Sequence, residues 1–275
     1  YTEGDREEIQ RFRKAFETYC REENIVSEFV RFHPVYQNQR HLEEWMDVRY
    51  DRETVYIDLT RTETEIIANY HQNHRRNLRK GMKNGLRFVY YEKEEAAGKI
   101  NEFYTMYRET MDKLNASKYS YFSLEYMEGI VKGMGENSVL GAVYYHGKMA
   151  AAALCLYANN VLHYHLGRSK KEFLPAGINV FLLHNLALWG KNKGFHTFHL
   201  GGGHVGRDSL FQFKHRFNQT GILDFYVGRK IHHPGKYAEL INKWEEYYGE
   251  KASEQFFPAY RYQPKKLAGT GTGGS

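Results

Sequence analysis

The stretch of residues 194–217, GFHTFHLGGGHVGRDSLFQFKHRF, predicts a helix end, a short strand, a glycine turn and a second helix. Gly194 follows an apolar helical run that ends at Trp189, where a C-terminal glycine belongs. Residues 195–200 alternate in a pattern typical of a strand with both faces at least partly covered. The three glycines at 201–203 then allow the backbone to turn sharply and approach a partner group.

The second helix of this stretch begins at Asp208 or Ser209 and carries Lys214 among aromatic residues. On a helix, Phe213 and Phe217 share a face, and Lys214 projects about 100° away. An ammonium group held among aromatic rings beside a glycine turn can stabilise a developing oxyanion or bind a phosphate. The alternative is a core strand-turn-helix element that ends in an ordinary surface lysine.

Composition limits the class of protein. The chain has 275 residues, 41% of them hydrophobic, which fits one large domain or two domains with a real core. The net charge of +6 fits a polyanionic partner without requiring one. Cys20 and Cys155 lie far apart, without metal-ligand spacing, so we expect a reduced, cytoplasmic protein without a metal site. No apolar run approaches the roughly 20 residues of a membrane span, and no signal sequence is recognisable.

Alternating helices and strands predict an α/β (α+β) fold. Three antiparallel strands at residues 139–145, 149–157 and 161–167 form a meander, and a helix at 177–193 leads into the stretch quoted above. We expect a first subdomain at residues 1–136 and a second at 137–236. A C-terminal helical segment at 237–266 packs back on the first subdomain, and residues 267–275 form a flexible linker or a remnant of cloning.

A cationic helix is expected at residues 62–83. Thr60 and Thr62 both have the capping-box spacing for its start. Residues 71–83 carry five formal positive charges and no acid, and such a cluster costs self-repulsion. Arg75, Arg76 and Arg79 are therefore candidates for contact with phosphates of a nucleotide-linked acceptor or of RNA. The alternative is a solvated helix face that pairs with acids elsewhere.

This order of motifs resembles the Fem family of aminoacyl-tRNA-dependent transferases, within the GNAT-fold acyltransferases. The matching stretches, in sequence order, are VRFHP at 30–34, NHRRNLRKGMKNGL at 73–86, FYTMYRETM at 103–111, YSYFSLEYM at 119–127, GINVFLLHNLALWGKNKGFHTFHLGGG at 177–203 and LFQFKHRFN at 210–218. The resemblance implies two tandem GNAT-like subdomains, each a mixed, largely antiparallel sheet flanked by helices. It also implies a role in building peptidoglycan cross-bridges or in modifying another amine of the cell envelope.

The resemblance also implies site residues. The phenylalanine-lysine pair of the family lies at the site for the aminoacyl ester and the tRNA terminus, and here it is Phe213 and Lys214. Lys214 is the expected catalytic residue, and the expected donor site consists of Phe213, Gly201, Gly202, Asn179 and Arg168. No cofactor is expected, because aminoacyl-tRNA is the co-substrate. Residues 168–179, RSKKEFLPAGIN, lack the glycine-rich turn with which GNAT enzymes hold the CoA pyrophosphate.

Two further questions stay open in the sequence. His165, His199 and His204 are candidates for acceptor contacts or for a general base. Two other functions compete with aminoacyl transfer. One is an acyl-CoA-dependent N-acyltransferase acting on an amino sugar or sugar nucleotide, in which Arg168, Lys170 and Lys171 hold phosphates. The other is a non-catalytic GNAT-like scaffold that binds nucleic acid or a protein.

Overall fold

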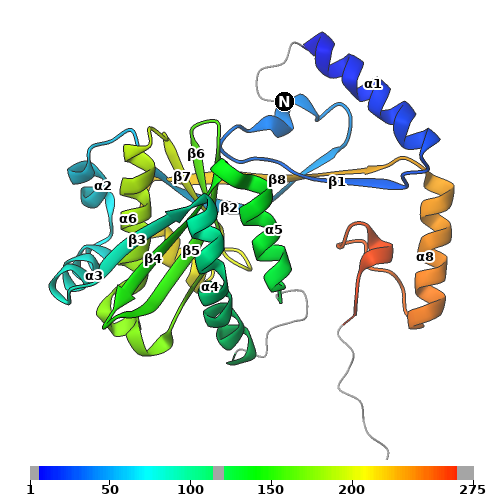
Figure 1. The fold of residues 1–275 in the computed structure, drawn as a ribbon. Coiled ribbons are helices and arrows are strands. Elements are labelled where there is room, and N and C mark those ends of the chain that lie inside the picture. Colours follow the sequence, from blue (N-terminus) through cyan, green and yellow to red (C-terminus); the bar gives the residue numbers. More distant parts are fainter. Residues whose placement is uncertain (1–5, 114–120, 265–275) are drawn as a thin grey trace, which may run out of the picture. The chain divides into compact units, whose positions relative to one another are not determined.

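The computed structural model of the protein describes residues 6–113 and 121–264 (Figure 1). Contacts divide the chain into two compact units. Tyr1–Arg52 and Asp224–Ser275 make up the terminal unit, and Glu53–Leu223 makes up the central unit. The tandem subdomains divided after residue 136 stay a prediction. Residues 119–120 of the YSYFSLEYM motif and the expected tail at 267–275 lie outside the described residues.

A mixed sheet forms the centre of the central unit. Its strands lie in the order β2-β7-β6-β5-β4-β3, and all neighbours are antiparallel except β6 and β7, which are parallel. The predicted mixed, largely antiparallel sheet is thereby confirmed. The strands are β2 (Asp47–Asp58, in this unit from residue 53), β3 (Arg87–Glu92), β4 (Ser138–Tyr145), β5 (Lys148–Ala158), β6 (Val161–Ser169) and β7 (Thr197–Gly201).

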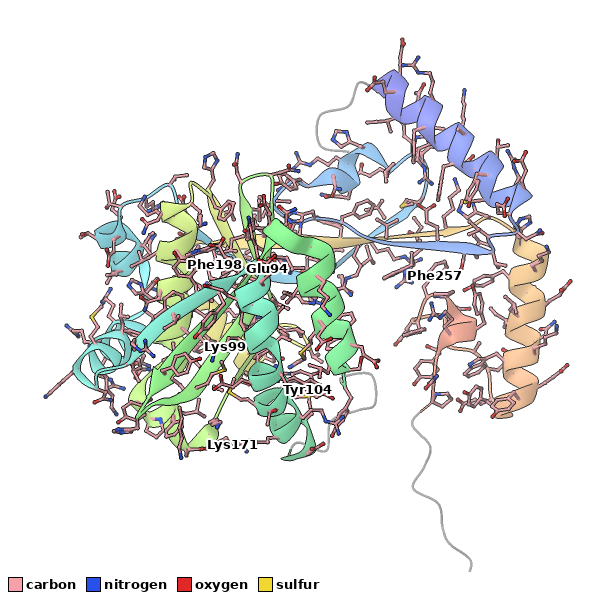
Figure 2. The ribbon with its side chains drawn as sticks, in the orientation of Figure 1. Glu94, Lys99, Tyr104, Lys171, Phe198 and Phe257 are labelled. Atoms are coloured by element: carbon pink, nitrogen blue, oxygen red, sulfur yellow. The ribbon has the colours of Figure 1, made fainter. Side chains whose placement is uncertain are left out.

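Helices cover both faces of this sheet. Helices α4 (Lys93–Lys113) and α5 (Leu124–Met134) pack on one face, and α6 (Ile178–Asn192) packs on the other (Figure 1). Each face has its own hydrophobic core, and Phe198 of β7 lies fully buried in the core beneath α6 (Figure 2). The alanine run 150–153 of β5 is fully buried because helices press on the strand from both sides. No helix of the described residues has the length and apolar character needed to cross a bilayer.

The cationic helix expected at residues 62–83 is in fact two helices, so the prediction of one helix was wrong. Helix α2 (Glu63–Asn69) begins at Thr62 with the predicted capping box. Tyr70 then takes an extended conformation, with ψ of 138°, and its fully buried ring packs edge-on against Phe217. Helix α3 (Gln72–Lys83) restarts at His71, whose Nδ1 accepts the Asn73 N–H. Burial of one tyrosine therefore outweighs the helical pattern around it.

The terminal unit combines residues from both ends of the chain. Strand β1 (Ser27–Arg31) pairs antiparallel with β8 (Ile222–Ile231, in this unit from residue 224). The C-terminal segment packs on residues near the N-terminus, as the hydrogen bond of 2.8 Å between Ser27 Oγ and Tyr260 Oη shows. The helices of this unit are α1 (Arg6–Glu22) and α8 (Pro234–Tyr248).

Candidate active site

The candidate site lies where two parallel strands of the central unit part. Strands β6 and β7 pair only from Val161↔Thr197 to His163↔His199. Beyond this point β6 carries a bulge, because Tyr164 lies opposite Cys155 and Leu166 lies opposite Leu154, which leaves His165 as the extra residue. Strand β7 ends at Gly201, whose φ of +74° suits a residue without a side chain. Beyond His163 and His199 the two strands therefore no longer pair with each other.

A cavity of about 430 Å³ opens at this parting. Thr110 of α4 comes from one face of the sheet, and Leu182 and Leu183 of α6 come from the other. The cavity therefore reaches elements on both faces of the sheet. Its remaining wall consists of Tyr164, Gly167, Arg168, Ser169, Asn179, His204, Ser209, Leu210, Phe213 and Lys214.

Helix α7 (Ser209–His215) carries the central residue of the site. Asp208 caps this helix, since its Oδ1 accepts the Phe211 N–H at 2.9 Å. Its Oδ2 accepts the N–H groups of His204 and Val205, at 2.8 and 3.3 Å, and so holds the loop before the helix. These backbone hydrogen bonds lower the pKa of the Asp208 carboxyl group. One carboxylate thus orders both the loop and the helix, whereas the sequence predicted only the helix cap, at Asp208 or Ser209.

Lys214 is buried, with 7% of its surface exposed. Its Nζ donates a hydrogen bond of 2.7 Å to the Gly202 carbonyl and lies 5.7 Å from the centre of the Tyr164 ring. It forms no ion pair with any described residue. Burial lowers its pKa from 10.5 to about 8, and the charge of Asp208 partly opposes this shift. An ammonium ion has three N–H donors, so Lys214 keeps donors available for a ligand in the cavity.

Phe213 is held beside Lys214 by its backbone. Its carbonyl accepts a hydrogen bond of 2.9 Å from Nε2 of His74 in α3, and its ring packs edge-on against Phe217. Burial lowers the pKa of His74 to about 4, so this imidazole is neutral. The Phe213 ring is only partly buried and lines the cavity, where it offers an aromatic face.

The predicted donor residues Arg168, Asn179, Gly201 and Gly202 gather at the same place. The Arg168 guanidinium donates to the Gly167 carbonyl at 2.7 Å and lies over the Tyr107 ring at 5.0 Å. Asn179 belongs to the first turn of α6, and that helix begins without a side-chain cap. The two glycines surround Nζ of Lys214, since Gly202 accepts its hydrogen bond and Gly201 lies next to it.

The predicted acceptor residues are divided. His204 lines the cavity, whereas His165 lies 3.4 Å from the Tyr126 hydroxyl of α5, and His199 Nδ1 lies 2.9 Å from Nδ1 of His163. The three arginines predicted for the acceptor, Arg75, Arg76 and Arg79, are not on the cavity wall. Arg75 donates to the Ala68 and Tyr70 carbonyls, where it satisfies the end of α2, and Arg76 and Arg79 are exposed on α3.

Sequence reasoning missed two of the residues that shape the site. The alternation of VLHYHLG in β6 indicated a strand but gave no reason to select Tyr164, whose ring faces the lysine. Thr110 lies 104 positions before Lys214 in a helix with an ordinary apolar pattern, so no local signal marks it. Both residues reach the cavity only through packing.

No curated protein matches the sequence. Among solved structures, FemX has a TM-score of 0.67 at 11% identity, over 86% of this chain and 79% of that chain. The C-terminal domain of a putative lysylphosphatidylglycerol synthetase from Agrobacterium fabrum has a TM-score of 0.61 at 17% identity, over 85% and 76%. L-PGS from Bacillus licheniformis has a TM-score of 0.58 at 14% identity, over 79% and 71%.

These structures share the fold of this chain. The sequence itself matches the family described as "Acetyltransferase (GNAT) domain" over residues 68–215, which covers α3, the meander, α6 and α7 with Lys214. The chain therefore belongs to the GNAT acetyltransferase-domain family.

Proposed function

We propose that this protein is an aminoacyltransferase that forms an amide from the ester of an aminoacyl-tRNA and an amine acceptor. The observation that carries the proposal is Lys214, a buried cation on the wall of a cavity, without an acidic partner among the described residues. Burying a charge without a partner is costly, so it is retained where a ligand supplies the missing negative charge. The acceptor is a peptidoglycan precursor or another amine of the cell envelope.

The reaction needs one site for negative charge. The neutral amine attacks the ester carbonyl, a C–N bond forms, and the carbonyl oxygen becomes an oxyanion. Lys214 stabilises this oxyanion with an N–H donor that the Gly202 carbonyl does not use. When the tetrahedral intermediate collapses, the ester C–O bond breaks, the ribose hydroxyl of the tRNA leaves with a proton, and the amine nitrogen loses one.

A histidine is available to accept that amine proton. His204 is the predicted candidate that lines the cavity, and its backbone N–H is fixed by Asp208. An imidazole within reach of the amine can act as general base, and such catalysis typically contributes about 10²- to 10⁴-fold. His165 and His199 are held by Tyr126 and His163 and are assigned no such role.

The aromatic wall supports an RNA-linked donor. The exposed face of Phe213 can stack on the terminal adenine of tRNA, and base-aromatic stacking is worth about 1–3 kcal/mol. The turn before α6 is the short 3-10 helix η4 (Lys171–Ala176), which contains Pro175. Proline lacks the N–H that would bind a pyrophosphate. Two of the similar structures bear the name lysylphosphatidylglycerol synthetase or its abbreviation, and that name describes the joining of an amino acid to an acceptor.

A second candidate function is acyl-CoA-dependent N-acyl transfer to an amino sugar or sugar nucleotide. The description of the matching family as acetyltransferase favours it. Arg168 on the wall, together with Lys170 and Lys171 at the start of η4, would then hold phosphates through side chains in place of backbone N–H groups. Of these residues, Lys171 is labelled in Figure 2. The same lysine would stabilise the oxyanion of a thioester reaction.

The two donors are distinguished by direct assay. The purified protein is incubated with charged tRNA or with acetyl-CoA, each with candidate amines, and consumption of the donor is measured. We expect consumption of charged tRNA, and we expect Lys214→Met to lower kcat by about 10²- to 10³-fold, the usual effect of losing one oxyanion donor. Lys148→Met, at the exposed first residue of β5, is the matched control.

Each alternative has its own outcome. If acetyl-CoA is consumed and charged tRNA is not, the protein is an acyl-CoA-dependent N-acyltransferase and the aminoacyltransferase proposal fails. If neither donor is consumed, and Lys214→Met binds nucleic acid as the wild type does, the protein is a binding scaffold and both proposals fail.

A further inference from the structure

Helix α3 carries a row of four cations that the cavity does not use. Arg76, Arg79, Lys80 and Lys83 are all exposed, and none of them forms an ion pair with a described residue. Their spacing of three and four residues places them along one side of the helix, where like charges repel each other by about 0.2–0.5 kcal/mol per pair. We call Arg76, Arg79, Lys80 and Lys83 the α3 cation row.

Several other exposed cations of the central unit differ from this row. Arg61 pairs with Asp58, Lys93 with Glu136 and Lys193 with Glu92, so acids placed nearby neutralise them. The helix dipole explains part of the row, because Lys80 and Lys83 lie in the last turn of α3, where cations are favourable. It does not explain Arg76 and Arg79, which lie in the middle of the helix.

The α3 cation row is connected rigidly to the candidate active site. His74 of the same helix donates to the Phe213 carbonyl, and the His71 N–H donates to the Arg216 carbonyl just after α7 at 2.8 Å. The backbone of Asn77 also packs against Gly177, so closely that a side chain at 177 would collide with the Asn77 carbonyl. Helix α3 therefore contacts both α7 and the start of α6, on either side of the cavity.

We infer that the α3 cation row binds the phosphate backbone of an RNA whose end enters the cavity. This inference rests on the proposed function, since it names the surface that holds the body of the RNA-linked donor. Arginine suits phosphate because its planar guanidinium can donate two parallel hydrogen bonds. Phe213, on the cavity wall and hydrogen-bonded to His74 of α3, supplies the stacking surface that a single-stranded end requires.

An anionic membrane is the competing partner for a cationic helix. A helix that lies on a membrane exposes large apolar side chains beside its cations. Helix α3 instead buries His74, Leu78 and Gly81 against the core of the central unit, and Met82 is its one exposed apolar side chain. The row therefore fits a polyanion that is held by charge alone, and RNA is favoured over a lipid surface.

Salt dependence tests the inference on the full chain. The probe is a fluorescein-labelled RNA hairpin that reproduces a tRNA acceptor arm with its single-stranded 3′ end, and affinity is measured by fluorescence anisotropy over a range of KCl concentrations. The test variant replaces all four residues of the α3 cation row with Gln. The control variant replaces four acid-paired cations, Arg49, Lys99, Lys132 and Lys251, with Gln and so changes the net charge equally.

We expect the α3 variant, and not the control, to reduce the slope of log affinity against log salt by about 3, at roughly 0.7–0.9 per phosphate contact. Between 50 and 200 mM KCl the wild type would then lose about 60-fold more affinity than the α3 variant. Circular dichroism should show the same secondary structure for both variants, because the replaced side chains contact solvent. Equal losses in the two variants would overturn the inference.

Two further results separate the inference from the proposed function. If phosphatidylglycerol vesicles bind through the row and the RNA hairpin does not, the partner is a membrane and the inference fails. If the wild type consumes charged tRNA but the α3 variant keeps the affinity and the salt slope, the inference fails and the function stands. If RNA binds through the row and no aminoacyl group is transferred, the inference stands and the proposed function fails.

Discussion

Two buried cations in this chain, Arg13 and Lys214, differ in whether a carboxylate pairs with them. In the terminal unit, Arg13 is 2% exposed and donates two hydrogen bonds to Glu28, at 2.9 and 3.0 Å. In the central unit, Lys214 is 7% exposed and donates to a neutral carbonyl, without a carboxylate of the described residues as partner. Arg13 has its counter-charge in the fold, whereas Lys214 lies on the wall of a cavity.

The difference separates a structural cation from a functional one. A buried charge that is paired in a bidentate geometry joins two elements, here α1 and β1, and its removal mainly affects folding. A buried charge without a counter-ion lowers the stability of the fold and has a shifted pKa, and such groups are concentrated at functional sites. Substitutions at Glu28 and Lys214 test whether the two cations behave in these two ways.

The largest expected effect is on stability in the terminal unit. Glu28→Ala removes the carboxylate and leaves Arg13 buried without it, which we expect to cost about 3–5 kcal/mol of unfolding free energy. Urea denaturation measures this loss. Glu44→Ala is the control, because the Glu44 pair with Arg6 is exposed on both sides and should be worth at most about 1 kcal/mol. Equal losses of stability in the two variants would contradict a structural role for Arg13.

Lys214→Met should act in the opposite direction and raise the free energy of unfolding at pH 7 by about 1–3 kcal/mol. The folded pKa of about 8 lies below the ordinary value of 10.5, so the unfolded chain binds more protons between these values and wild-type stability rises with pH through that window. The advantage of the variant is therefore complete below pH 8 and disappears as the pH approaches 10.5. Denaturation of the variant and the wild type at pH 7 and pH 10 measures this difference in stability. A variant less stable than the wild type at pH 7 would contradict the conclusion that Lys214 is a destabilising buried cation.

The pH dependence of the transfer rate tests the functional role of Lys214. Lys214 must be protonated to stabilise an oxyanion, so with a pKa of about 8 the rate should fall by about tenfold between pH 7 and pH 9. Hydroxylamine as acceptor isolates this effect, because it stays uncharged over the range. Lys214→Arg keeps its charge at every pH in use and should lose the alkaline decline, even with a lower rate. A decline that persists in this variant would belong to another group.

The smallest expected effect concerns the loop that supports Lys214. Asp208→Ala removes the helix cap and should lower the free energy of unfolding by less than Glu28→Ala does. It also removes the charge that raises the pKa of Lys214, so the alkaline decline should move to lower pH. A pH–rate profile of the variant measures this shift. A decline at unchanged pH would show that Asp208 acts on the loop alone.

Local patterns in the sequence predicted most of the secondary structure. The capping box at Thr62, the Asp208 cap and the strand alternation of the meander are interactions between residues a few positions apart, so they can be identified in the chain itself. The break at Tyr70 could not be identified, because a helical pattern continues through it and the reason for the break is the distant ring of Phe217.

The sequence by itself determined the mixed α/β fold, and it singled out Lys214 beside a glycine turn. Only the tertiary structure decided that this lysine is buried, that Tyr164 and Thr110 complete its cavity, and that Arg75 closes the end of a helix while Arg76 and Arg79 remain exposed. The physical reason is that caps and alternation depend on near neighbours, whereas burial and charge pairing depend on which distant segments pack together. The absence of a carboxylate partner is what indicates that a buried cation is functional. Whether such a partner is present depends on tertiary packing.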